Sequence, residues 1–189
     1  TIVISPLVAL IRDQVVKLRD LGVPFVNALV SGTSAAEMEE ALTDARAGKT
    51  KLLYLAPERL RDPRLRAFLP QIPIVQIVVD EAHCISTWGH DFRPDFLEIP
   101  ALLTERATTR DIPVHALTAT APPRVQSEIE TILEFGVSGR GQEIIRGKYA
   151  RENLVYRVYH VANRREREQR AVALVKQIVS NPERGGAGI

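Results

Sequence analysis

Short apolar runs rich in β-branched residues alternate with amphipathic helical segments along most of this chain, and this alternation limits the possible folds. The runs cover residues 1–5, 24–30, 51–56, 74–79 and 114–117. Helices are expected over residues 6–21, 33–47, 95–106 and 122–135, with a short helical segment from Pro57. Strands of this kind are typical of a parallel sheet covered on both faces. The sequence therefore predicts a doubly wound α/β fold.

Residues at the helix ends support this division of the chain. Ser5 and Pro6 are expected to provide an N-cap and a first helical residue, and Thr33 or Ser34 to cap the second helix. Gly48-Lys49-Thr50 is similar to the end of a phosphate-binding loop, but the first glycine of that pattern would fall on Thr43, and a helix precedes a strand here. We expect Gly48 to end a helix instead.

The last quarter of the chain differs from the rest. Residues 1–139 contain 14 lysines and arginines against 18 acidic residues, whereas residues 140–189 contain 11 against 5. This basic segment fits a solvated helix face better than a site for a polyanion. We expect a first domain over residues 1–150, then an interdomain linker and the start of a second, similar domain over residues 151–189. A strand is expected at 154–160 and a helix at 164–180.

The composition indicates the kind of compartment in which the protein is expected. No apolar stretch approaches the roughly 20 residues that span a bilayer, so a membrane partner is not expected. The single cysteine, Cys84, excludes an internal disulfide and favours a reducing compartment, either cytoplasmic or nuclear. The chain begins within an apolar run and ends on residues typical of a strand start, which indicates a fragment of a longer protein.

Two carboxylates end the apolar run at 74–79. Asp80 and Glu81 follow it directly, and neighbouring strand residues face opposite sides. Ligands of open α/β sheets bind at the carboxyl ends of the strands, where one carboxylate can hold Mg²⁺ and the other can orient a water. The alternative is that both residues only begin a helix, where negative charge favours the dipole.

Four segments in order carry a family resemblance. They are Ser5-Pro6-Leu7-Val8-Ala9-Leu10-Ile11-Arg12-Asp13-Gln14, Tyr54-Leu55-Ala56-Pro57-Glu58-Arg59-Leu60, Asp80-Glu81-Ala82-His83 and Ala116-Leu117-Thr118-Ala119-Thr120-Ala121. They resemble motifs Ia, Ib, II and III of superfamily 2 helicases. The aromatic-rich segment at 84–96 resembles the corresponding loop of RecQ DNA helicases. The resemblance covers nearly all of the first 150 residues and implies a RecA-like domain.

The RecQ resemblance implies an ATP-dependent DNA helicase that moves 3′ to 5′ and acts in DNA repair and recombination. It implies that Asp80 binds Mg²⁺ through water, that Glu81 is the catalytic base for water attack on ATP, and that His83 with Thr118 and Thr120 couples the nucleotide site to DNA. Alternatives remain for two of these roles. His83 could be a half-buried structural histidine, and Thr118 and Thr120 could cap the next helix. Zinc binding by His83 with Cys84 is not expected, because no second ligand pair is evident.

The aromatic-rich segment suits unpaired nucleic acid. Trp88 and Phe92 offer faces on which bases can stack, and Arg93 adds a positive charge. Trp88, and more so Phe96, could instead belong to the core. The resemblance adds DNA-binding positions in the first two motifs, at Ser5, Pro6, Gln14, Pro57, Glu58 and Arg59. Their turns could hold phosphates through backbone amides, or only begin helices, with Arg59 solvated.

The chain also departs from the family pattern. The phosphate-binding loop and adenine-recognition segment of the family are absent, and Arg151-Glu152-Asn153 has glutamate where the family has proline. We therefore expect this polypeptide alone to bind ATP poorly and to unwind nothing. Two other functions stay open, an RNA-directed superfamily 2 helicase and a nucleic-acid-binding module without ATPase activity. Protein partners cannot be named from the sequence.

Overall fold

The fold was analysed in a computed structural model of residues 1–189. The structure describes residues 1–107, 112–136, 142–147, 153–155 and 157–180. The chain divides into two compact units, Thr1–Glu143 and Ile144–Ile189. The boundary that we expect at 150/151 lies outside the described residues.

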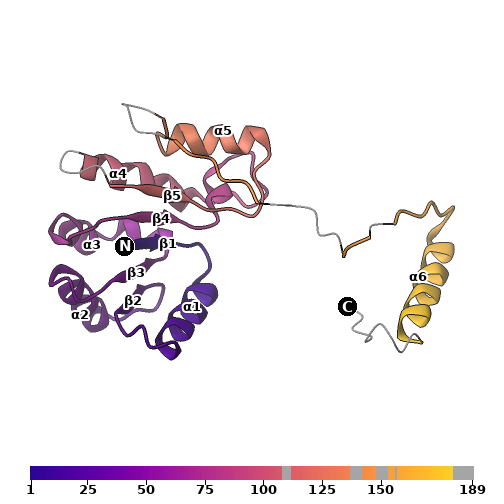
Figure 1. The fold of residues 1–189 in the computed structure, drawn as a ribbon, viewed down its shortest axis with the longest axis horizontal. Helices are drawn as coiled ribbons and strands as arrows, with labels where there is room; N and C mark the ends of the chain where they lie inside the picture. The colour runs from indigo at the N-terminus through magenta and orange to yellow at the C-terminus, as the bar shows by residue number, and fades with distance from the viewer. Residues whose placement is uncertain (108–111, 137–141, 148–152, 156, 181–189) are drawn as a thin grey trace. The chain divides into compact units, whose positions relative to one another are not determined.

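The first unit is built on a five-stranded sheet (Figure 1). The strands are β1 (Ile2–Ile4), β2 (Val26–Leu29), β3 (Leu52–Leu55), β4 (Ile77–Val79) and β5 (Val114–Ala116), in the order β2-β3-β1-β4-β5. Every pairing is parallel, with Ile4 aligned to Leu55 on one side and to Val79 on the other. The predicted α/β parallel sheet is confirmed.

Helices cover both faces of this sheet. They are α1 (Val8–Asp20), α2 (Ala35–Arg46), α3 (Pro63–Phe68), α4 (Ile99–Ala107) and α5 (Pro123–Ile132). Figure 1 shows α1 on one side of the sheet and α2, α3 and α4 on the other. The core follows this division: Ile11 and Val15 of α1 pack with one set of sheet residues, and Met38 and Leu42 of α2 pack with the larger set.

Four 3₁₀ segments connect the regular elements: η1 (Pro57–Arg61), η2 (Leu69–Gln71), η3 (Ala82–Ile85) and η4 (Pro94–Glu98). The short helical segment predicted from Pro57 is η1. The helix expected over 95–106 is η4 followed by α4. Two of these segments, η1 and η3, directly follow the carboxyl ends of strands, so they bring their side chains to one edge of the sheet.

The helix ends agree with the sequence in part. Ser34 caps α2 in a capping box, accepting a hydrogen bond from the Glu37 N–H while its own N–H donates to the Glu37 carboxylate. Gly48 has φ +72° just beyond α2, as expected of a glycine that ends a helix. The N-cap predicted at Ser5 is wrong, because α1 begins at Val8 and its N-cap residue, Leu7, offers no side-chain acceptor.

The second unit contains α6 (Arg164–Val179), whose N-cap Asn163 accepts a hydrogen bond from the Glu166 N–H. This confirms the helix expected at 164–180. The strand expected at 154–160 is wrong for residues 153–155 and 157–160, none of which lies in a strand. A strand needs a partner for its backbone groups, and a run of apolar residues does not supply one. Among the described helices, none is long and apolar enough to cross a bilayer.

Candidate functional site

The predicted site residues meet at the carboxyl edge of the sheet. Ser5 follows β1, Pro57 follows β3 after one residue, Asp80 follows β4, and Thr118 follows β5 after one residue. These four strands are neighbours in the order β3-β1-β4-β5, so a set of motifs separated by up to 113 positions forms one row. Gln14 lies apart from this row, in the middle of α1.

Asp80 is held in place by the neighbouring strand. The Ser5 hydroxyl, fully buried, donates to Asp80 Oδ2 at 3.0 Å, and the Asp80 N–H donates to the Ile4 carbonyl at 2.8 Å. The Glu81 N–H donates to Asp80 Oδ1 at 3.0 Å. Each carboxylate oxygen keeps a second lone pair after these bonds. The arrangement fits a carboxylate that holds a hydrated Mg²⁺ through water.

Glu81 does not continue the strand. β4 ends at Val79, and Glu81 has φ 48° and ψ 45°, in the left-handed region. Our expectation that strand alternation separates the two carboxylates is therefore wrong, because the ladder has ended before them. A tight turn separates them instead, with the Ala82 N–H donating to the Leu117 carbonyl at 2.9 Å. Such a backbone conformation costs a non-glycine residue roughly 1–2 kcal/mol and is found most often at functional sites.

His83 connects the acidic turn to the segment after β5. Its Nδ1 lies 3.2 Å from Glu81 Oε2 and 3.0 Å from Thr118 Oγ1. The contact with Thr118 is a hydrogen bond, and the approach of the Glu81 carboxylate to the same nitrogen is a close polar contact. The Thr118 hydroxyl in turn donates to the Thr120 carbonyl at 3.0 Å and accepts from the Thr120 N–H. The alternative role of Thr118 and Thr120 as caps is wrong, since α5 begins at Pro123 without a side-chain cap.

Cys84 lies in a small polar cluster beneath the loop. Its Sγ is 3.8 Å from His83 Nε2 and 3.8 Å from Asp91 Oδ2, and these three ligand-type atoms lie within 4.8 Å of one another. Burial, and then the neighbouring Asp91 charge, raise the pKa of the Cys84 thiol to about 11. Asp91 is already paired with Arg93 at 3.0 Å. Three ligand groups among the described residues fall short of the four that a structural zinc site takes, and one of them is this paired carboxylate, so we interpret the cluster as a polar support for the loop.

The aromatic residues of the loop have different environments. Trp88 is 59% exposed and Phe92 is 36% exposed, whereas Phe96 is fully buried in the core. The alternative that Phe96 is a core residue is therefore confirmed, and Trp88 is not part of the core. Arg93 donates to the Pro6 carbonyl at 3.1 Å, which ties the loop to the segment after β1.

The polar side chains of the segment after β3 are used in contacts within the protein. Glu58 accepts a hydrogen bond from the Ser31 hydroxyl at 2.7 Å, and Arg59 donates to the Thr33 carbonyl at 3.3 Å. The Arg59 side chain is largely buried, and its Nε is the one buried side-chain polar atom without a partner among the described residues. The alternative of a solvated Arg59 is wrong, because this guanidinium fastens η1 to the loop after β2.

Two residues of α5 that were not predicted from the sequence, Arg124 and Glu128, face the aromatic loop. Ser86 and Thr87 donate their hydroxyl hydrogens to the carboxylate of Glu128 on α5, and the Arg124 guanidinium of α5 lies 3.2 Å from the centre of the Trp88 ring. Charged residues on the polar side of an amphipathic helix do not reveal in the sequence which loop they contact. Only the four-residue spacing of Arg124 and Glu128, which puts both on one helix face, could have suggested them.

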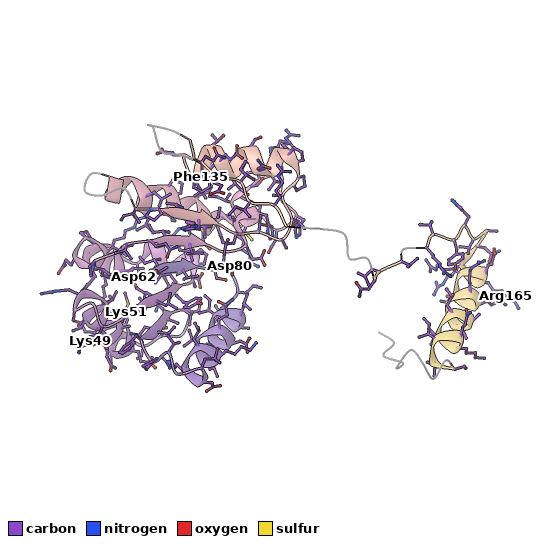
Figure 2. The ribbon with its side chains drawn as sticks, viewed as in Figure 1. Lys49, Lys51, Asp62, Asp80, Phe135 and Arg165 are labelled. Carbon is purple, nitrogen blue, oxygen red and sulfur yellow. The ribbon has the colours of Figure 1, made fainter. Side chains whose placement is uncertain are left out.

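The Gly48-Lys49-Thr50 segment lies far from this row. It precedes β3 and therefore occupies the amino edge of the parallel sheet, while Asp80 occupies the carboxyl edge (Figure 2). Lys49 pairs with Asp44 at 3.1 Å. The segment ends a helix and begins a strand, in agreement with the rejection of a phosphate loop here.

Comparisons with known proteins agree with this fold and with the resemblance to helicases. A family model described as DEAD/DEAH box helicase matches residues 1–129. The chain is 47% identical over 141 residues to "ATP-dependent DNA helicase Q5" of Rattus norvegicus, a match that covers 71% of this chain and 14% of the relative. It is 39% identical over 167 residues to "ATP-dependent DNA helicase RecQ" of Bacillus subtilis, which covers 87% of this chain and 27% of the relative.

The fold also has relatives among solved structures. An ATP-dependent RNA helicase, described as hypothetical, from Sulfolobus tokodaii aligns with a TM-score of 0.50 at 19% identity, over 74% of this chain and 38% of that one. The chain thus spans 14% and 27% of the lengths of the two DNA helicases named above, and 38% of the Sulfolobus tokodaii chain. The chain belongs to the DEAD/DEAH box helicase family, with RecQ-type helicases as its homologues.

Proposed function

We propose that this chain is part of an ATP-dependent DNA helicase of the RecQ type, which couples Mg²⁺-ATP hydrolysis to 3′ to 5′ movement on single-stranded DNA and to duplex unwinding. Its role would be in DNA repair and recombination, and its compartment the one that holds DNA, the bacterial cytoplasm or the nucleus. ATP and DNA are the proposed partners. The path from Glu81, in close contact with the His83 ring, to the hydrogen bond between His83 and Thr118 carries the proposal.

The acidic turn supplies the hydrolytic groups. Mg²⁺, when bound, would neutralise charge on the phosphates. Asp80 would hold the ion's water shell, oriented by the Ser5 hydroxyl and by the Glu81 N–H. Glu81, fixed in its left-handed turn, would accept a proton from the attacking water. The His83 ring, 3.2 Å from this carboxylate through Nδ1, would help to hold it in position.

His83 gives the hydrolytic and DNA-binding groups a direct connection. Its Nδ1 faces both Glu81 and Thr118, so a movement of the Glu81 carboxylate during hydrolysis would alter the hydrogen bond between His83 and Thr118. Thr118 also bonds the backbone at Thr120, which leads into α5. Networks with two alternative hydrogen-bonding states are a known way to switch a segment.

The DNA-binding surface would lie beside this path. Trp88 and Phe92 expose ring faces on which bases can stack regardless of sequence, and Arg93 holds the loop against Pro6. The side chains at Ser5 and Pro6 and at Pro57, Glu58 and Arg59 are buried or paired. The prolines have no N–H, and the N–H groups of Ser5 and Arg59 donate to backbone carbonyls, so phosphates at these turns would be bound by the remaining backbone N–H groups. Gln14, half-buried on α1, would make a side-chain contact farther along the strand.

The test is ATP hydrolysis by the intact parent protein, with Mg²⁺, alone and with single-stranded DNA or RNA of one sequence. We expect stimulation by DNA, and loss of turnover by at least about a hundredfold in Glu81→Gln, since removing a general base costs 10²–10⁴ in rate. Glu58→Gln, which alters a carboxylate in the same row away from the acidic turn, is the matched control for turnover without nucleic acid.

Other outcomes would assign other functions. Stimulation by RNA and not by DNA would indicate an RNA-directed helicase. Nucleic-acid binding without hydrolysis, unaffected by Glu81→Gln, would indicate a binding module. Turnover by the 189-residue chain itself that Glu81→Gln abolishes would reveal a phosphate site within these residues.

A further inference from the structure

Helix α5 presents two charged side chains to the aromatic loop from one face. Arg124 and Glu128 are four residues apart and therefore lie one above the other. The buried side of the same helix is anchored in the core by Val125 and Ile129. The two charged groups are thus fixed to a rigid element, and neither belongs to the motifs that the sequence analysis singled out.

Glu128 holds the turn at residues 86–88. Its Oε1 accepts the Thr87 hydroxyl at 3.0 Å, and its Oε2 accepts a short hydrogen bond from the Ser86 hydroxyl. Ser86 is fully buried, and its Oγ also accepts the Trp88 N–H at 3.2 Å. The bond from Ser86, followed by those from residues 87 and 88, lowers the pKa of the Glu128 carboxyl. An ionised carboxylate therefore anchors the backbone that carries Trp88.

Arg124 holds the side chain of the same tryptophan. Its guanidinium carbon lies 3.2 Å from the centre of the Trp88 ring, a close cation–π contact. One face of the indole is thereby covered, yet Trp88 stays 59% exposed. A base can therefore reach the uncovered part of the ring without displacing Arg124.

These contacts run parallel to the path through His83. His83 lies within η3 and Ser86 directly follows it, whereas Thr118 precedes α5 and Glu128 lies in it. His83 bonds Thr118, and Ser86 bonds Glu128, so two links join the same two segments. The turn that carries Trp88 is therefore fastened to the segment of α5 at more than one point.

We propose that Arg124 and Glu128 are positioning residues that hold Trp88 for base stacking. This inference rests on the proposed function for its DNA partner. The holding of Trp88 is a property of the DNA-free chain and can be measured separately.

Trp88 is the sole tryptophan, so its fluorescence reports this loop directly in the 189-residue chain. The measurement is acrylamide quenching and the emission maximum for wild type, Glu128→Ala, Glu128→Gln, Arg124→Ala and Arg124→Lys. We expect easier quenching and red-shifted emission in Glu128→Ala, a smaller change in Glu128→Gln, which keeps one accepting oxygen, and recovery of the Arg124→Ala change by Arg124→Lys. Glu130→Gln, on the same helix but bonded to Gln126, is the control.

The second arm measures binding of a single-stranded oligonucleotide by anisotropy of a label on the DNA. Loss of an ordered stacking face is expected to weaken binding about tenfold in Glu128→Ala. Arg124→Ala leaves the Glu128 bonds intact and so tests the proposal if Glu128→Ala does not fold, which circular dichroism will show.

The outcomes separate the two claims. Quenching and emission unchanged in folded Glu128→Ala and Arg124→Ala would overturn the inference. So would altered fluorescence with wild-type DNA affinity, provided that Trp88→Ala weakens binding. Absence of DNA binding by the wild-type chain would count against the proposed function, while the quenching comparison would still decide whether α5 holds the loop.

Discussion

At the scale of single residues, the candidate site depends on groups whose ordinary properties have been altered by their surroundings. Glu81 adopts a left-handed backbone, Ser5 is buried with its hydroxyl on Asp80, and Cys84 is buried between His83 and Asp91. Each case costs free energy that the surrounding sheet must compensate. The local structure around the acidic turn is therefore determined by side chains that follow three different strands.

Cys84 offers a direct test of this local environment. Since burial and Asp91 raise its pKa to about 11 from 9.0, its thiolate fraction at pH 8 should be about a hundredfold below that of a free thiol. We expect correspondingly slow reaction with a disulfide reagent in the folded chain and rapid reaction in denaturant. The folded state also holds this proton more tightly, so stability from this group is lost as pH rises from 9 toward 11. Rapid labelling of native protein would contradict the assignment.

Gly89 is required by close packing. A Cβ at this position would lie 2.6 Å from the His83 carbonyl oxygen and 3.1 Å from that of Ser86. These are backbone atoms, so Gly89→Ala must displace the loop, and we expect a loss of about 1–3 kcal/mol in the free energy of unfolding together with altered Trp88 emission. Gly147→Ala, where a Cβ meets nothing within 4 Å, is the control. Equal stability of the two variants would show that the loop adapts freely.

At the scale of elements, helix starts show where local rules succeed. The capping box of Ser34 and Glu37 forms as a local pattern predicts, because both partners lie within one helical turn. The cap expected at Ser5 and the alternative cap at Thr120 do not form, because the Ser5 hydroxyl donates to Asp80 and the segment at 118–120 is held by the Thr118 hydroxyl. Tertiary contacts override capping preference where a better partner is available.

This contrast predicts different effects on stability. Ser34→Ala removes the acceptor for the Glu37 N–H and should lower the free energy of unfolding by about 1 kcal/mol. Thr120→Ala should change it by less than about 0.5 kcal/mol, because its side chain is exposed and caps no helix. Urea denaturation of both variants measures the difference. A larger loss in Thr120→Ala would indicate a side-chain contact at this position.

At the scale of the whole molecule, the parallel sheet gathers distant motifs along one edge. Its strand order sets β4, with the acidic turn, between β1 and β5, so Asp80 bonds to the residue after β1 and His83 to the residue after β5. Nucleotide chemistry and a nucleic-acid surface can therefore share one edge. Coupling between them needs only the few hydrogen bonds described.

The intact parent protein tests this coupling. Trp88→Ala should weaken the stimulation of ATP hydrolysis by single-stranded DNA about tenfold or more, because a stacking contact of 1–3 kcal/mol is lost. Hydrolysis without DNA should be unchanged, since Trp88 lies outside the acidic turn. Phe96→Ala is the contrasting variant, because its ring is fully buried and its loss should destabilise the fold instead. Unaltered stimulation in Trp88→Ala would show that Trp88 does not contribute to the stimulation of ATP hydrolysis by DNA.

The sequence by itself determined the five strands of the first unit, most helices, the motifs and the family. These features follow from apolar periodicity and from short patterns such as Asp80-Glu81-Ala82-His83, which are local along the chain. Only the tertiary structure decided that Glu81 leaves the strand, that Ser5 supports Asp80, and that Arg124 and Glu128 hold Trp88. These contacts join positions 36 to 75 residues apart, and no local pattern encodes which distant polar group a side chain will meet when the strands align.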